Sequence, residues 1–217
     1  MAWDFAAQVH ALTGFDADAS TNTETGETYR TMTAQWLKDA AKEVINLLPP
    51  NLQKMCTATE SFTSTAVGSE GEVLNTGKVF NVFAGNYEAR EIPSSMKHKA
   101  NDSDSLEYAT STDPIYYVEN NKINVLPASL SCKYEELQFP TISFDDTTIS
   151  TFPDEAEHLV VLKAAIIALE YQMAVEEDMQ LYTPMIVNLK QDYLQGINAL
   201  QLGRLIQPKK KETKKEK

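Results

Sequence analysis

The residue types that most often do chemistry are scattered along this 217-residue chain. His10, His98 and His158 lie in different segments, whereas a metal site needs at least one local pair of ligands or closely spaced thiolates. His158 falls within one predicted helical turn of Asp154 and Glu155, a cluster that could hold an adventitious cation but is more typical of a solvated first turn. We therefore expect no metal site and no cofactor.

The remaining nucleophiles and carboxylates are equally isolated. Asp145 and Asp146 could form a carboxylate pair, but a turn explains the same two residues. Cys56 and Cys132 do not make a disulfide framework, and their surroundings are typical of small apolar residues at strand edges. No nucleophile elbow, phosphate-binding loop or glycine-rich dinucleotide turn occurs. These observations predict a protein that is not an enzyme.

Two helices are predicted in the N-terminal quarter of the chain. A longer one is expected from Thr33, a suitable N-cap, to Leu48, because Pro49 and Pro50 stop it. A short one should end at Gly14, since the apolar residues before that glycine recur at helical spacing: Trp3, Phe5, Ala6, Val9 and Leu12. The two aromatic residues of this set either staple the short helix to the core or anchor a partner, and the pattern favours neither.

The segment from Phe152 to Leu202 predicts two long amphipathic helices, with a break near Tyr182-Thr183-Pro184. The first of them is apolar on more than one side, which indicates burial on more than one side. We expect neighbouring subunits to cover part of it. The candidate ring-packing residues are Leu159, Val160, Leu162, Ile166, Ile167 and Leu169.

Residues 57–150 have a different composition, rich in Thr, Ser, Val, Tyr and Phe and punctuated by glycine. The clearest signal is a hairpin of Ile115–Val118 and Ile123–Leu126, joined through Asn120-Asn121, because asparagine tolerates positive φ. Further strands are expected at Lys78–Phe83 and Ser131–Leu137. The long polar segment from Ser94 to Ser111 is expected to be an exposed loop.

These elements predict an α+β fold: an antiparallel helical bundle with an inserted antiparallel β module and a flexible basic C-terminal tail. The expected parts are an N-terminal arm with the first helices (1–56), the β module (57–150), the long C-terminal helices (151–206) and the tail (207–217).

The charge of the chain is unevenly distributed. The last ten residues contain six lysines and two glutamates, a charge of +4, which leaves −16 on the rest because the total is −12. An acidic body repels nucleic-acid phosphates, so DNA gripping is disfavoured, although an acidic wall suits a channel through which DNA slides. The tail either solubilises the chain or docks on an acidic groove or near DNA phosphates. The candidate docking residues are Gln207, Pro208, Lys209, Lys210, Lys211, Lys214, Lys215 and Lys217.

Membrane insertion is not expected. The start of the chain lacks a charged-then-apolar signal, and uninterrupted apolar stretches such as Ala164–Leu169 are far shorter than the roughly 20 residues of a membrane span. We therefore expect a soluble protein.

Four segments together resemble the head-to-tail adaptor (connector) proteins of tailed bacteriophages. They are WLKDAAKEVINLLP (36–49), DPIYYVEN (113–120), FPDEAEHLVVLKAA (152–165) and LKQDYLQG (189–196). The resemblance covers roughly residues 30–200 and consists of helix patterns rather than catalytic motifs. The β insertion is larger than in the minimal, all-helical members of that family.

The resemblance implies a non-enzymatic virion protein of the neck, at the head-tail junction, made in the host bacterial cytoplasm. Such adaptors form a ring, usually of twelve subunits, beneath the portal protein, and continue the DNA channel to the tail tube or nozzle without sequence-specific DNA binding. Their C-terminal segment commonly reaches into the portal. Two alternatives remain: a tail-completion or fibre- or spike-attachment protein that uses the β module, and a small regulatory protein that acts through the basic tail.

Overall fold

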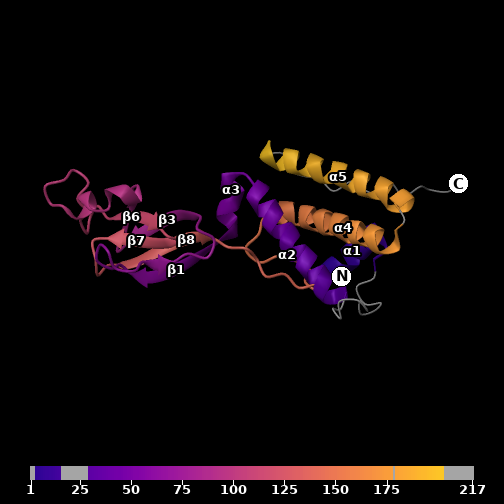
Figure 1. The fold of residues 1–217 in the computed structure, drawn as a ribbon, viewed down its shortest axis with the longest axis horizontal. Helices are drawn as coiled ribbons and strands as arrows, with labels where there is room; N and C mark the ends of the chain where they lie inside the picture. The colour runs from indigo at the N-terminus through magenta and orange to yellow at the C-terminus, as the bar shows by residue number, and fades with distance from the viewer. Residues whose placement is uncertain (1–2, 16–28, 178, 203–217) are drawn as a thin grey trace. The chain divides into compact units, whose positions relative to one another are not determined.

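The computed structural model describes residues 3–15, 29–177 and 179–202 and divides the chain into two compact units (Figure 1). The helical unit comprises Met1–Met55 and Phe139–Lys217, and the β unit comprises Cys56–Gln138. The prediction of an α+β fold with a β module inserted into a helical unit is confirmed.

Helix α1 (Phe5–Thr13) is defined by its two caps. The carboxylate of Asp4 accepts a hydrogen bond from the backbone N–H of Ala7 at 2.7 Å, which satisfies one of the open donors of the first turn. Gly14 adopts a left-handed φ of 73° and ends the helix, as predicted.

The chain returns to the helical unit earlier than the predicted boundary at residue 150, because the β unit ends at Gln138. The backbone N–H groups of Phe5 and Ala6 donate to the carbonyls of Asp146 and Phe144, both at 2.9 Å. The returning segment therefore belongs to the helical unit, since it supplies acceptors for the first turn of α1.

Helix α2 (Tyr29–Leu47) already includes the residue predicted to cap it. Thr33 is fully buried within the helix, and its hydroxyl donates to the carbonyl of Tyr29 at 2.9 Å. The N-cap prediction is therefore wrong, because a threonine hydroxyl can bond back to the preceding turn as well as cap. The helix does end before the two prolines, and the short helix α3 (Pro50–Gln53) follows.

The last two helices are α4 (Asp154–Glu176) and α5 (Met179–Gln201). The break between them was predicted at Tyr182-Thr183-Pro184, and this is wrong: Pro184 lies inside α5, and Glu177 at the end of α4 has a left-handed φ of 56°. Pro184 is the sixth residue of its helix, so it removes the single hydrogen bond that a backbone N–H at this position would donate to the carbonyl of Gln180, just past the first turn.

Helix α4 is the centre of the helical unit and packs against α1, α2 and α5. Figure 1 shows α5 running antiparallel along α4. An aromatic chain ties the neighbours together, since the Trp36 ring of α2 lies 5.3 Å from Phe15 and 5.5 Å from Tyr171 of α4.

The β unit contains two four-stranded sheets, ordered β1-β8-β3-β4 and β2-β7-β6-β5. All pairings are antiparallel except that of β5 with β6, which is parallel and departs from the predicted all-antiparallel module. The short helix η1 (Lys54–Cys56) precedes the strands β1 (Thr57–Thr63), β2 (Glu72–Val73), β3 (Val79–Ala84), β4 (Tyr87–Glu88), β5 (Arg90–Glu91), β6 (Ile115–Glu119), β7 (Lys122–Leu126) and β8 (Ser131–Leu137).

The predicted hairpin is present as β6 and β7, and both Asn120 and Asn121 have positive φ, 52° and 59°. Its two faces have different roles. One face joins a core with the other sheet, to which Tyr116, Ile123 and Val125 contribute from the hairpin and Val82 and Tyr134 from the first sheet.

The opposite face of the hairpin is partly covered by the segment between β5 and β6, which was expected to be an exposed loop. Two short 3₁₀ turns, η2 (Ser94–Met96) and η3 (Lys99–Asn101), fold this segment back so that Ala100 and Ala109 are buried against Ile115 and Tyr117. Small apolar residues in a polar sequence gave too weak a signal to predict this burial.

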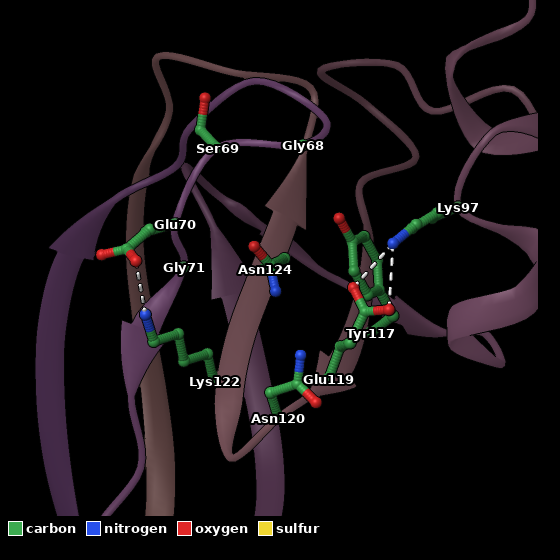
Figure 2. A pocket seen from close by; sticks show the side chains of 10 residues that line it. All are labelled: Gly68, Ser69, Glu70, Gly71, Lys97, Tyr117, Glu119, Asn120, Lys122 and Asn124. Atoms are coloured by element: carbon green, nitrogen blue, oxygen red, sulfur yellow. Dashed lines mark hydrogen bonds and ion pairs between the residues drawn. The ribbon is translucent and has the colours of Figure 1, made fainter.

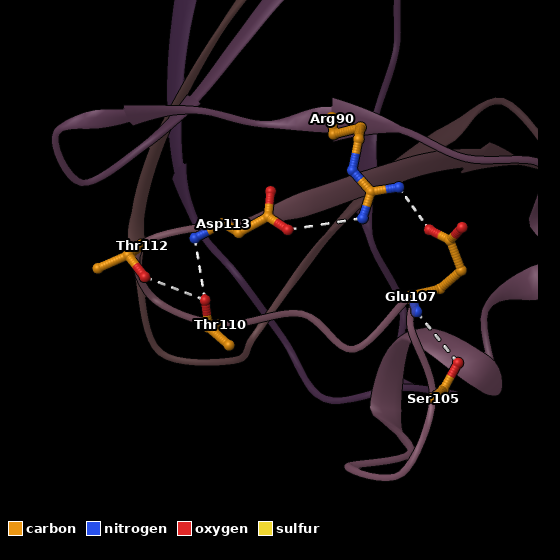
Figure 3. Close-up of polar contacts among 6 residues, drawn as sticks. All are labelled: Arg90, Ser105, Glu107, Thr110, Thr112 and Asp113. Carbon is orange, nitrogen blue, oxygen red and sulfur yellow. Dashed lines mark hydrogen bonds and ion pairs between the residues drawn. The ribbon is translucent and has the colours of Figure 1, made fainter.

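A polar cluster fastens the same segment to the sheet (Figure 3). The guanidinium of Arg90 in β5 hydrogen-bonds to Glu107 and lies 3.5 Å from the carboxylate of Asp113. Thr110 accepts a hydrogen bond from the backbone N–H of Asp113 at 3.0 Å and so closes the turn before β6. These contacts hold the C-terminal part of this segment against β5.

Candidate assembly surface

The predicted ring-packing residues lie in the core of the helical unit rather than on its surface. Of these six side chains of α4, five are buried and Ile167 is partly buried: Leu159, Val160, Leu162, Ile166, Ile167 and Leu169. The expectation that neighbouring subunits cover part of this helix needs correction, because α1, α2 and α5 of the same chain cover it. A helix that is apolar on several sides is explained by a central position in its own bundle.

The predicted docking tail, Gln207, Pro208 and the lysines at 209, 210, 211, 214, 215 and 217, lies outside the described residues. Its role therefore stays a prediction.

The surface with the clearest signature is the outer side of α5. Apolar and amide side chains alternate along it at spacings of three and four residues, and all are exposed. We call these residues the outer strip: Val187, Gln191, Leu194, Asn198 and, directly after the end of the helix, Leu202. Val187, Leu194 and Leu202 are 48%, 59% and 69% exposed, and Leu181 and Met179 near the start of the helix are similarly open.

The outer strip contains no charge. Within the bounds of α5 the charged residues are Lys190 and Asp192, two of 23 positions, although 23% of the chain is charged. Lys190 forms an ion pair with Glu170 of α4 at 2.8 Å. Charge depletion with exposed apolar groups is characteristic of the centre of protein–protein interfaces, whereas an ordinary solvated helix face carries charges.

The inner side of α5 fixes the position of the strip. Tyr182, Ile186, Tyr193, Ile197 and Leu200 are buried at helical spacing. Polar contacts add to this packing.

The main polar contact involves three helices. The hydroxyl of Tyr193 donates to Glu43 of α2 at 3.1 Å, and the same carboxylate pairs with Lys163 of α4 at 2.8 Å. Burial and the carboxylate of Glu43 raise the pKa of Tyr193, so the hydroxyl stays protonated and remains a donor. The outer strip is therefore presented by a helix that is anchored to two others.

The candidate chemical residues are not brought together. No group of three or more His, Cys, Asp or Glu side chains with metal-binding geometry exists among the described residues. Burial lowers the pKa of His158, and Asp192 partly opposes this shift. Asp146 accepts a hydrogen bond from the backbone N–H of Ser143 at 2.7 Å. This contact favours the interpretation of Asp145 and Asp146 as part of a turn over that of a catalytic carboxylate pair.

Both cysteines are buried free thiols. Burial raises the pKa of Cys56 to about 11 and also raises that of Cys132. A thiol with so high a pKa is protonated at neutral pH and is a poor nucleophile.

By length and composition alone, α4 could cross a membrane. Half of its most apolar window is buried against the rest of the chain, and its first turn carries Asp154, Glu155 and Glu157. The central position in the helical unit accounts for the apolar composition of this helix.

No protein-family model matches this chain, and a search of curated proteins finds no match either.

Proposed function

We propose that this chain is a non-enzymatic structural protein of a tailed-phage virion, which forms a ring beneath the portal and connects the head to the tail. The observation that carries the proposal is the outer strip of α5, an uncharged and partly apolar helix face on a strongly acidic chain. The resemblance of residues 30–200 to head-to-tail adaptors supplies the virion context.

The occupant that best suits the outer strip is a second copy of the chain. Two copies of a body with a charge of −16 repel each other wherever their carboxylates meet, and this repulsion is smallest between faces without charge. The amides of Gln191 and Asn198 donate and accept hydrogen bonds, so they suit another uncharged helix or strand. The same acidic body suits a channel wall along which DNA passes without sticking.

The proposed ring joins a portal protein on one side and a tail tube or nozzle protein on the other, with a tail fibre as a possible further partner. No membrane and no cofactor takes part. The runner-up is a fibre- or spike-attachment protein, in which the β unit rather than the outer strip would carry the main contact.

The test compares the full chain with two substitutions by light scattering coupled to size-exclusion chromatography, alone and with a purified portal ring. Leu194→Glu places a charge in the middle of the outer strip and is expected to abolish the ring or its addition to the portal. Leu106→Glu is the matched control, because Leu106 is fully exposed in the β unit. It should assemble like the unmodified chain.

Circular dichroism of both variants separates loss of assembly from loss of fold, since neither residue is buried. A Leu194→Glu variant that assembles normally would remove the outer strip from the interface. A monomer that ignores the portal, with or without the substitution, would favour the fibre-attachment alternative.

A further inference from the structure

A pocket of about 240 Å³ opens on the outer face of the β6–β7 hairpin (Figure 2). This volume is below the roughly 300–1,000 Å³ of pockets that hold drug-sized ligands. The residues that matter for its chemistry are Gly71, Lys97, Tyr117, Glu119, Lys122 and Asn124.

Strand register places the central polar residues side by side. Tyr117 of β6 and Asn124 of β7 are direct cross-strand partners, so their side chains lie on the same face of the sheet. The segment that contains Ala100 and Ala109 covers the neighbouring part of this face and packs against the Tyr117 ring. The pocket is the part of the face that this cover leaves open.

Two side chains that are buried except at their polar ends line the pocket, and these ends have no hydrogen-bond partner among the described residues. Tyr117 is 2% exposed and Asn124 is 8% exposed, yet neither the phenol hydroxyl nor the side-chain amide makes a hydrogen bond within the protein. The phenol hydroxyl and the amide are accessible through the pocket, where they can hydrogen-bond to water or to a ligand. Burial raises the pKa of Tyr117, so its hydroxyl is a protonated donor at neutral pH.

The charges around these two groups cancel in pairs. Lys97 contacts both carboxylate oxygens of Glu119 at 2.8 and 2.9 Å, and Lys122 lies 3.2 Å from Glu70. In Figure 2 Asn124 lies between these two ion pairs. An anion would have to compete with the carboxylates for each ammonium group, and a cation would have to compete with the ammonium groups for each carboxylate. The pocket therefore favours a neutral ligand.

Gly71 forms a close wall beside Asn124. A Cβ atom at this position would lie 2.3 Å from the carbonyl oxygen of Ile123 and 2.6 Å from Oδ1 of Asn124. Only glycine permits this approach, which confines the amide of Asn124.

We propose that this pocket binds a neutral polyhydroxylated ligand of the size of one hexose unit, with its hydroxyl groups bonded to Tyr117 and Asn124. A sugar hydroxyl donates and accepts at once, as do the phenol and the amide that it would meet. The ion pairs at the rim offer further acceptors and donors without a net charge. This proposal is independent of the ring function, because it uses only residues of the β unit.

The test uses saturation-transfer difference NMR on the full chain, with D-glucose, D-galactose, N-acetyl-D-glucosamine and short oligosaccharides of each at millimolar concentration. Inorganic phosphate and putrescine, observed by ³¹P and ¹H line broadening, are the charged probes. We expect binding of at least one sugar and of neither charged probe. Comparison of each monosaccharide with its oligosaccharides shows whether the ligand is a free sugar or a unit within a chain.

Two substitutions place the binding site. Tyr117→Phe removes the hydroxyl and keeps the ring, and Asn124→Leu removes the amide at similar volume, so each should weaken sugar binding about tenfold. Tyr108→Phe is the matched control at an exposed tyrosine outside the pocket and should not change binding.

Three results would overturn the proposal. The first is no binding of any sugar, which would mean that water alone fills the pocket. The second is binding of phosphate or putrescine in place of a sugar. The third is sugar binding that survives both pocket substitutions in variants that circular dichroism shows to be folded.

Discussion

Glu43 and Tyr193 are joined by a hydrogen bond of 3.1 Å, although they lie 150 residues apart in the chain. The β unit is inserted between α2, which carries Glu43, and α5, which carries Tyr193. The bond thus links the two parts of the chain that make up the helical unit. Lys163 of α4 contacts both residues. Its ammonium group pairs with the carboxylate of Glu43 and lies 5.8 Å from the centre of the Tyr193 ring.

Removal of this hydrogen bond should weaken the helical unit moderately. Tyr193→Phe keeps the ring and loses the hydroxyl, so we expect a loss of about 1 kcal/mol in the free energy of unfolding. Urea denaturation followed by circular dichroism measures it. Tyr108→Phe, at an exposed tyrosine of the β unit, should be neutral. Equal stability of the two variants would show that the Tyr193–Glu43 hydrogen bond adds no stability beyond that of the Glu43–Lys163 ion pair.

A charge in the core of α4 should be far more damaging. Ile166 is 2% exposed, so Ile166→Asp buries an unpaired carboxylate and should cost several kcal/mol and prevent folding of the helical unit. Limited proteolysis of the expressed full chain reports the outcome. Leu194→Asp, with the same type of change on the outer strip, should resist the protease like the unmodified chain. A folded Ile166→Asp variant would contradict the central position of α4.

The cysteines should be inert in the folded protein. Cys56 and Cys132 are both 0% exposed, and burial raises the pKa of each thiol. Iodoacetamide at about pH 8 should therefore modify neither residue in the native state and both after denaturation in urea, as intact-mass measurement would show. Rapid native labelling of either thiol would mean that the β unit opens locally at that residue.

Glu157 predicts a pH dependence of stability. Burial, with a smaller contribution from Asp154, raises the pKa of this carboxyl above 4.5, although its hydrogen bond from the backbone N–H of Ile149 opposes the shift. A raised pKa means that the folded state binds the proton more tightly. Protonated Glu157 therefore stabilises the folded state. This contribution is complete below the unfolded-state pKa and is lost as pH rises through the folded-state pKa.

The variant Glu157→Gln tests this sign because it stays neutral and keeps an acceptor oxygen for Ile149. Its Tm should match that of the unmodified chain at about pH 4 and exceed it slightly at about pH 7. A lower Tm at neutral pH would show that attraction between the carboxylate and the helix N-terminus outweighs its burial.

The lysine-rich end can be tested by truncation after Gln207. If the tail docks on the portal, the shortened chain should keep its thermal stability and bind a portal ring more weakly, with a smaller loss at high salt, because the lost contacts are ionic. Replacement of the six lysines by glutamine in the full-length chain is the charge control. Unchanged portal binding in both variants would leave the tail as a solubilising end.

The sequence alone determined the elements whose signals are local. The Asn120-Asn121 turn and the end of α1 at Gly14 follow from residues that tolerate positive φ, and the strand Ser131–Leu137 follows from the composition of its segment. The insertion of a β-rich segment into a helical chain followed from composition and periodicity. The depletion of charge in α5 is also visible in the sequence, because its 23 positions contain one lysine and one aspartate.

Only the tertiary structure decided which faces are covered, because burial depends on neighbours that are distant in sequence. The apolar sides of α4 suggested partners in other subunits, whereas helices of its own chain enclose them. Thr33 resembles a cap, but the helix continues on both sides of it. Tyr117 and Asn124 share a pocket because strand register pairs them and a folded-back segment leaves that end open. Periodicity shows that a face is apolar or polar, and packing determines what that face meets.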